Sequence, residues 1–94
     1  MQVRVRVPSA LRELTGGQAG LTIEVADGAT VRQLLDAVGA LHPAFERRVR
    51  DEQGTLRTHV NVFVADEDVR ALDGLDTRLD ADDEVSVLAA ISGG

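Results

Sequence analysis

The stretch Thr30-Val-Arg-Gln-Leu-Leu-Asp-Ala-Val-Gly-Ala-Leu41 decides the fold, because it carries the strongest helical pattern in the 94-residue chain. Five apolar residues recur at helical spacing and predict one buried face: Val31, Leu34, Leu35, Val38 and Leu41. Thr30 and Gln33 have the spacing of a capping box, so the helix should begin after Thr30. Gly39 weakens the helix or helps to end it, and His42-Pro43 stops it. Pro43 to Val49 is a candidate for a second, short helix.

Two strands are predicted upstream of this helix. Gln2 to Val7 alternates strictly, with its valines facing inward and Arg4 and Arg6 facing outward. Leu21 to Val25 alternates again, and the segment between the two strands contains turn residues. The two strands should therefore form a hairpin.

Downstream of the helix, His59 to Val64 and Glu84 to Ile91 are predicted strands. In the first of them, three valines share one face, which leaves Asn61 and Phe63 on the other. In the second, Ser86 and Leu88 should face outward. Between these strands, a turn is expected over residues 66–68, a weakly extended segment over 69–72 and an acidic loop over 74–83.

This order of elements predicts an α+β fold, in which a mixed sheet of four to five strands carries one main helix on one face. The last strand should lie beside the first, in parallel. Residues 1–91 are expected to form a single domain, and residues 92–94, Ser-Gly-Gly, a flexible tail.

Composition excludes several functional classes. The chain has no cysteine, and His42 and His59 lie too far apart for a zinc motif, so no metal site is expected. No apolar run is long enough to cross a membrane, which makes the cytoplasm the default location. Residues 66–94 hold nine acidic residues and two arginines, a balance of −7 that disfavours nucleic-acid binding. Such charge suits a basic partner surface, or simply keeps the protein soluble.

Several segments together resemble the MoaD/ThiS family of sulfur carriers, and among them the carriers that serve cysteine synthesis. The resemblance covers nearly the whole chain, and its segments are Leu11-Arg12, Thr15-Gly16-Gly17-Gln18, Val60 to Val64, Asp66 to Arg70 and Ser92-Gly93-Gly94. It implies the ubiquitin-like β-grasp fold. The family tail usually ends Ala-Gly-Gly, whereas this chain has Ser92, a difference that bears on partner choice.

The resemblance also implies a carrier that is not itself an enzyme and binds no cofactor. An adenylating enzyme of the MoeB/ThiF type, using ATP and Mg²⁺, would activate the carboxylate of Gly94, which then becomes a thiocarboxylate. The sulfur acceptor would be a cysteine synthase, with a metalloprotease that trims the carrier, or the large subunit of molybdopterin synthase. A second alternative is a protein modifier that is linked through Gly94 to lysines of other proteins.

The outer face of the sheet is the predicted partner surface. If the last strand lies between the first and the third, six outward residues become neighbours: Arg4, Arg6, Asn61, Phe63, Ser86 and Leu88. Phe63 and Leu88 would then form an exposed apolar patch with an arginine rim, which is typical of a binding site. The alternative is that Phe63 points inward beneath a loop.

Overall fold

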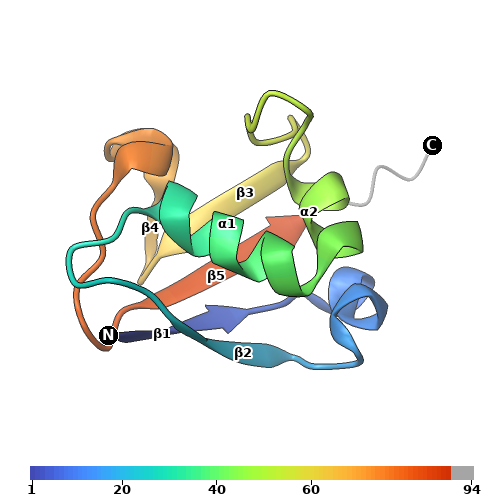
Figure 1. Cartoon of the computed structure of the whole chain (residues 1–94). Coiled ribbons are helices and arrows are strands. Elements are labelled where there is room, and N and C mark those ends of the chain that lie inside the picture. Colours follow the sequence, from blue (N-terminus) through green and yellow to red (C-terminus); the bar gives the residue numbers. More distant parts are fainter. Residues whose placement is uncertain (90–94) are drawn as a thin grey trace.

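A computed structural model describes residues 1–89 and shows a five-stranded mixed sheet in the order β2-β1-β5-β3-β4 (Figure 1). The strands are β1 (Gln2–Arg6), β2 (Gly20–Glu24), β3 (Val60–Val64), β4 (Glu67–Asp68) and β5 (Glu84–Ala89). The helices are α1 (Val31–Leu41) and α2 (Pro43–Val49), and the 3₁₀ turns are η1 (Ser9–Thr15), η2 (Val69–Ala71) and η3 (Gly74–Asp76). Both α-helices lie on the same face of the sheet (Figure 1).

The centre of the sheet is the parallel pairing of β1 with β5, which confirms the arrangement expected from the sequence. Val5 lies opposite Val85, and Val62 of β3 lies opposite Val87. All four of these side chains are buried against the helices. The alternating pattern therefore has the predicted parity in all three central strands.

Helix α1 begins as predicted, because the Thr30 side chain accepts a hydrogen bond from the Gln33 N–H and the Gln33 side chain accepts one from the Thr30 N–H. Four members of its apolar stripe are buried: Val31, Leu34, Leu35 and Val38. The expectation for Leu41 is wrong, since its side chain is 66% exposed. Leu41 is the last residue of α1, and among residues 1–89 it is neither in the core cluster nor packed against it. No helix within residues 1–89 is both long and apolar enough to cross a bilayer.

The segment after β3 differs from the prediction. Ala65 and Asp66 make the turn, Glu67 and Asp68 pair with β3, and Val69–Ala71 forms a 3₁₀ turn in place of an extended segment. The physical reason is the Asp68 carboxylate, which accepts a hydrogen bond from the Arg70 N–H at 2.8 Å and caps the turn. The turn therefore comes earlier than residues 66–68, and the extended residues are 67–68 instead of 69–72.

A buried ion cluster joins α2 to α1. Arg50, which is 6% exposed, donates from Nε to Glu46 Oε1 at 2.6 Å and from Nη2 to Asp36 Oδ1 at 2.7 Å, and also to Glu46 Oε2. The hydrogen bonds that Arg50 donates to the Glu46 carboxylate, and further to Asp36, raise the pKa of Arg50 against the effect of burial. Gly39 does not end α1. A Cβ at Gly39 would lie 2.5 Å from Glu46 Oε2 and 3.1 Å from Glu46 Cβ, so glycine leaves the room that Glu46 needs.

We predict that Leu34→Ala lowers the free energy of unfolding by about 2–5 kcal/mol, because Leu34 is fully buried and the substitution leaves a cavity. The matched control is Leu41→Ala in the same helix, which should change stability by less than about 0.5 kcal/mol. Urea denaturation of both variants measures the difference. Equal losses would contradict the burial of the α1 stripe on the sheet.

Gly39→Ala is expected to destabilise the protein by about 1–3 kcal/mol, the usual cost of overpacking, although alanine is the better helix former. The cause is specific, since the new methyl group displaces Glu46 from Arg50. A double-mutant cycle with Glu46→Ala tests this cause. In the Glu46→Ala background, Gly39→Ala should become neutral or stabilising, and an unchanged cost would disprove the explanation.

Candidate functional site

The sheet face opposite α1 and α2 gathers the six residues predicted for the partner surface. Arg6 lies opposite Ser86, and Ser86 lies opposite Phe63, so these three form a row across the central strands. Asn61 lies opposite Leu88 in the next row, and Arg4 lies opposite Glu84. Parity along the strands thus brings side chains from β1, β5 and β3 onto one surface.

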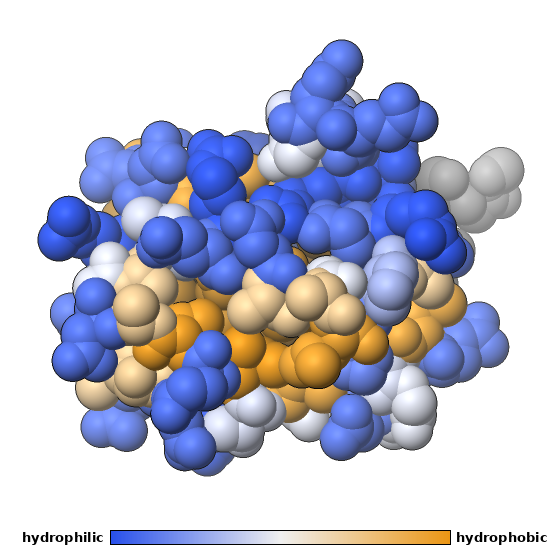
Figure 2. Space-filling model, in the orientation of Figure 1, coloured by the Kyte–Doolittle hydropathy of each residue, from blue (hydrophilic) through white to orange (hydrophobic). Residues whose placement is uncertain are grey.

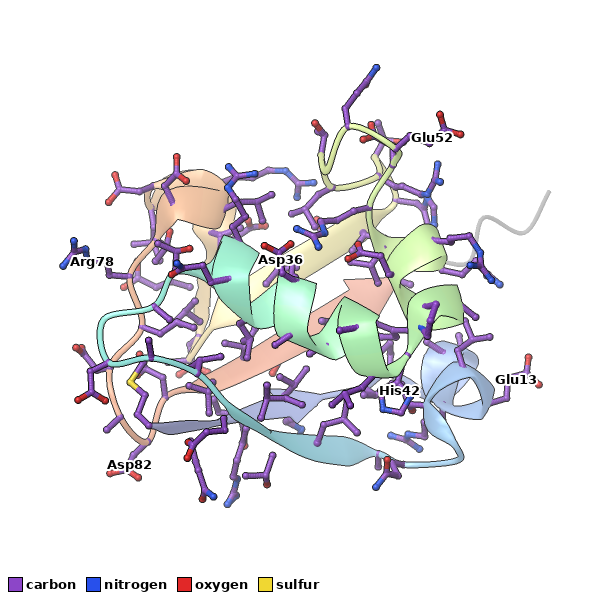
Figure 3. The ribbon with its side chains drawn as sticks, viewed as in Figure 1. Glu13, Asp36, His42, Glu52, Arg78 and Asp82 are labelled. Atoms are coloured by element: carbon purple, nitrogen blue, oxygen red, sulfur yellow. The ribbon has the colours of Figure 1, made fainter. Side chains whose placement is uncertain are left out.

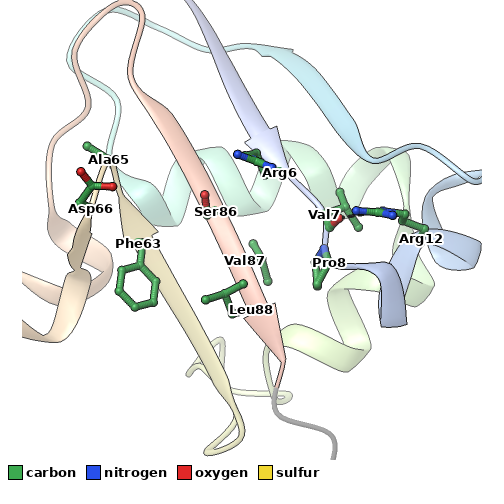
Figure 4. Close-up of a pocket in the computed structure, with 10 residues that line it drawn as sticks. All are labelled: Arg6, Val7, Pro8, Arg12, Phe63, Ala65, Asp66, Ser86, Val87 and Leu88. Atoms are coloured by element: carbon green, nitrogen blue, oxygen red, sulfur yellow. Dashed lines mark hydrogen bonds between the residues drawn. The ribbon is translucent and has the colours of Figure 1, made fainter.

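The centre of this open face is apolar. Leu88 is 48% exposed, and Phe63 is half-buried and lies outside the core cluster. The alternative in which Phe63 points into the core is therefore wrong. Phe63 and Leu88 extend from neighbouring strands over the same part of the sheet (Figure 4). An exposed leucine beside a half-buried phenylalanine offers a binding partner an apolar anchor, since covering the pair removes apolar area from water.

A hollow of about 440 Å³ extends from Phe63 and Leu88 toward the end of β1 (Figure 4). The further residues around it are Arg6, Val7, Pro8, Arg12, Ala65, Asp66, Ser86 and Val87. Pro8, Arg12, Ala65 and Asp66 were not predicted to belong to this surface. The alternation along the strands does not predict where these four side chains point, because all four lie in the turns after β1 and β3. Arg12 is positioned there by its Nε, which donates to the Val7 carbonyl oxygen at 3.1 Å.

The two arginines at the rim of the open face, Arg4 and Arg6, both lie near the carboxylate of Glu84. Arg4 and Arg6 approach the Glu84 carboxylate at 3.9 and 3.7 Å, and both arginine side chains are about 70% exposed. Exposed ion pairs of this kind contribute little to stability. A partner's acidic groups can therefore replace Glu84 as the acceptors for these arginines at a small cost in free energy. Glu84 was missed as a face residue, although it has the same parity as Ser86 and Leu88.

Asn61 is held by an interaction that the sequence did not indicate. Arg70 donates from Nη1 to Asn61 Oδ1 at 2.6 Å and from Nη2 to the Val60 carbonyl oxygen at 2.9 Å. The 3₁₀ turn η2 brings Arg70 back across β3, with Asp68 3.7 Å from its guanidinium group. The amide oxygen of Asn61 is therefore already engaged, and the apolar centre with Arg6 and Arg12 is the more available part of the face.

Ala89, the last described residue of β5, directly follows Leu88 at the apolar centre of the open face. The predicted tail residues Ser92, Gly93 and Gly94 lie outside the described residues. Within residues 1–89, no group of three or more histidine, cysteine or acidic side chains is placed to hold a metal ion. What the described face offers chemically is recognition, through an apolar centre bordered by guanidinium groups.

Comparisons with known proteins identify the relatives of this chain. The ThiS family matches residues 5–94. The sulfur carrier protein CysO of Mycobacterium tuberculosis is 36% identical over 96 residues, and the small archaeal modifier protein 3 of Haloferax volcanii is 35% identical over 94 residues; in both cases 100% of each chain is covered. A chain of the Amycolatopsis orientalis BexX/CysO complex superimposes with a TM-score of 0.86 at 36% identity, covering 98% of this chain and 99% of that chain. The expected β-grasp fold and the resemblance to the MoaD/ThiS sulfur carriers, CysO among them, are confirmed.

Proposed function

This chain belongs to the ThiS family of ubiquitin-like sulfur carriers, and on that premise we propose that the carboxylate of Gly94 is the group that carries sulfur. The match to CysO extends over the full length of both chains, and this observation carries the proposal. The position of the open face beside Ala89 of β5 supports it, because a partner bound there lies near the point from which the chain continues to Gly94.

The chemistry requires activation by another protein. A carboxylate is a poor electrophile, so the Gly94 carboxylate attacks the α-phosphate of ATP, which forms an acyl-adenylate and releases pyrophosphate. Hydrosulfide, or an enzyme persulfide, then attacks the acyl carbon, and AMP leaves. The persulfide gives an acyl disulfide, which a second thiol of that enzyme cleaves to the thiocarboxylate with formation of an enzyme disulfide. Reaction with hydrosulfide gives the thiocarboxylate directly. An enzyme of the MoeB/ThiF type would supply the ATP site, the Mg²⁺ and the catalytic groups, and the carrier would supply only the reacting carboxylate.

Glycine suits both final positions of such a substrate. Without a Cβ, Gly93 and Gly94 allow the backbone to approach a nucleotide closely and to adopt φ and ψ values that are closed to other residues. Ser92 is the departure from the usual family ending. A small hydroxyl side chain should still pass through a narrow channel, so we expect activation to be retained.

Cysteine biosynthesis is the outlet that we favour, because the CysO relatives are matched at 36% identity along their whole length. The thiocarboxylate would then transfer its sulfur in the active site of a cysteine synthase. A second function is supported by the modifier protein of Haloferax volcanii at 35% identity, in which case Gly94 would be joined to lysines of target proteins. A role with the molybdopterin synthase large subunit is the remaining alternative, and purified acceptors distinguish the three.

The first prediction of this proposed function concerns Gly94. After incubation with a MoeB/ThiF-type enzyme, Mg-ATP and sulfide, intact-mass spectrometry should show one oxygen exchanged for sulfur. Deletion of Gly94 is the control, because it removes the carboxylate from its position and leaves residues 1–89 unaltered. An unchanged mass, with an enzyme that forms the adenylate on another carrier, would refute the proposal.

The second prediction concerns the open face. Phe63→Ala should weaken binding to the adenylating enzyme by about 1–3 kcal/mol, or roughly 5- to 150-fold in Kd, because it removes the aromatic anchor beside Leu88. Leu72→Ala is the matched control, since Leu72 is 39% exposed but does not line the hollow. Titration calorimetry measures both variants, and circular dichroism verifies their folding. Wild-type affinity in the Phe63→Ala variant would place the interface elsewhere.

A further inference from the structure

The outer edge of β2 presents backbone groups that nothing else in residues 1–89 pairs with. Val7 N–H donates to the Ala19 carbonyl at 2.8 Å, and Val25 N–H donates to the Met1 carbonyl at 2.9 Å. With the register of the hairpin, these bonds turn the N–H and C=O groups of the odd-numbered β2 residues toward β1. The corresponding groups of Gly20, Thr22 and Glu24 therefore point away from the sheet. No backbone hydrogen bond within the described part of the chain uses them.

The surface between this edge and α1 is apolar, and we call it the apolar shelf. Figure 2 shows an apolar band that runs between α1 and β2 across the front of the molecule. Leu21 and Ile23 face the helices from β2, and α1 contacts β2. Leu41 at the end of α1 is 66% exposed, although it belongs to the stripe whose other members are buried. Leu41 therefore adds an exposed apolar side chain at the end of α1, the helix that contacts β2.

The edge also lacks the usual protection against strand pairing. Edge strands are commonly blunted by proline, by lysine or by a bulge. Residues 20–24 contain no proline and no basic residue, and their pairing with β1 is continuous over the whole strand. The one charged side chain of β2 is that of Glu24, at the end of the strand.

The strand is complementary to a second copy of itself. In an antiparallel pair centred on Thr22, each Thr22 exchanges N–H···O bonds with its counterpart, and Gly20 does so with the other copy's Glu24. Leu21 of each copy lies beside the other copy's Ile23 on the helical face, which joins the two apolar shelves. The carboxylate of Glu24 meets Gly20, which has no side chain, so no like charges face each other in the ladder.

We propose that two copies of this chain associate through their β2 edges about a two-fold axis, so that their two sheets become one continuous sheet. A two-fold interface of this kind uses the same patch on both subunits. The open face around Phe63 and the end of β5 remain uncovered, so the dimer is compatible with carrier activity and does not depend on it. Each copy carries a formal charge of −6, and the resulting repulsion weakens association at low salt.

Sedimentation velocity from about 10 µM to about 1 mM protein tests the proposal over the range expected of a small interface. The expected result is a reversible monomer–dimer equilibrium that shifts toward the dimer as salt is raised. Hydrogen exchange of the Thr22 amide should slow by about fourfold between the two concentration limits for a Kd of about 100 µM, and by no more than about tenfold for a tighter dimer, because only the free monomer exposes that amide.

Thr22→Pro should abolish the dimer, because it removes the central donors while leaving the β1–β2 ladder intact. Thr22→Val keeps the N–H group and should dimerise like the wild type. Leu41→Asp places a charge on the shelf and should also prevent association, whereas Leu88→Asp on the open face should not. If Thr22→Pro fails to fold, the Leu41→Asp variant and the Thr22 exchange rate decide. A monomer at all concentrations, a dimer that survives Leu41→Asp, or loss of the dimer in Leu88→Asp would overturn the proposal.

Discussion

The parallel pairing of β1 with β5 holds the first and last strands of the described chain side by side in the middle of the sheet. Val5 and Val85 face each other there, and both are completely buried. Burial of such a valine layer is the main favourable term available to a small domain with few aromatic residues. A shift of either strand by one residue would expose that layer, so the register of the central pair is strongly determined.

The same constraint creates the open face. Once Val62 and Val87 are committed to the core, Phe63 and Leu88 must point to the other side of the sheet. Both α-helices of the described chain lie on the valine side (Figure 1). The apolar centre of the open face is therefore a geometric consequence of the core, and its exposure costs hydrophobic free energy unless a partner covers it.

Regular repetition in the sequence is what made the fold predictable. A period of two residues in the strands and of 3.6 residues in α1 gave the correct faces, and the Thr30–Gln33 capping box gave the correct helix start. Prediction was wrong where the outcome depends on tertiary neighbours. Leu41 fits the helical period but is exposed at the end of α1, and the segment around Asp68 is shaped by a side-chain cap.

The residues of the candidate site likewise fall into those that the strand pattern predicted and those that it did not. Its strand residues, such as Phe63 and Ser86, were predictable from parity, since each strand continues a pattern that the core imposes. Arg12 and Arg70 were not, because each reaches the surface from a 3₁₀ turn and is held by a backbone carbonyl oxygen, that of Val7 after β1 for Arg12 and that of Val60 in β3 for Arg70. Gly39 was misread for a related reason. Its role depends on Glu46 and Arg50 of the following helix, and a local helix propensity carries no information about them.

On the proposed function, recognition and reaction lie in different parts of one small chain. The reacting atoms would belong to Gly94, which is the same chemical group whichever enzyme uses it. Discrimination between an adenylating enzyme and a sulfur acceptor must then come from the surface that each partner touches. Phe63 and Leu88 supply apolar area that any partner with a complementary surface can cover, whereas Arg6 and Arg12 require matching acceptors. Changes at the two arginines should therefore alter the choice of partner, and changes at the apolar pair should alter the affinity for all of them.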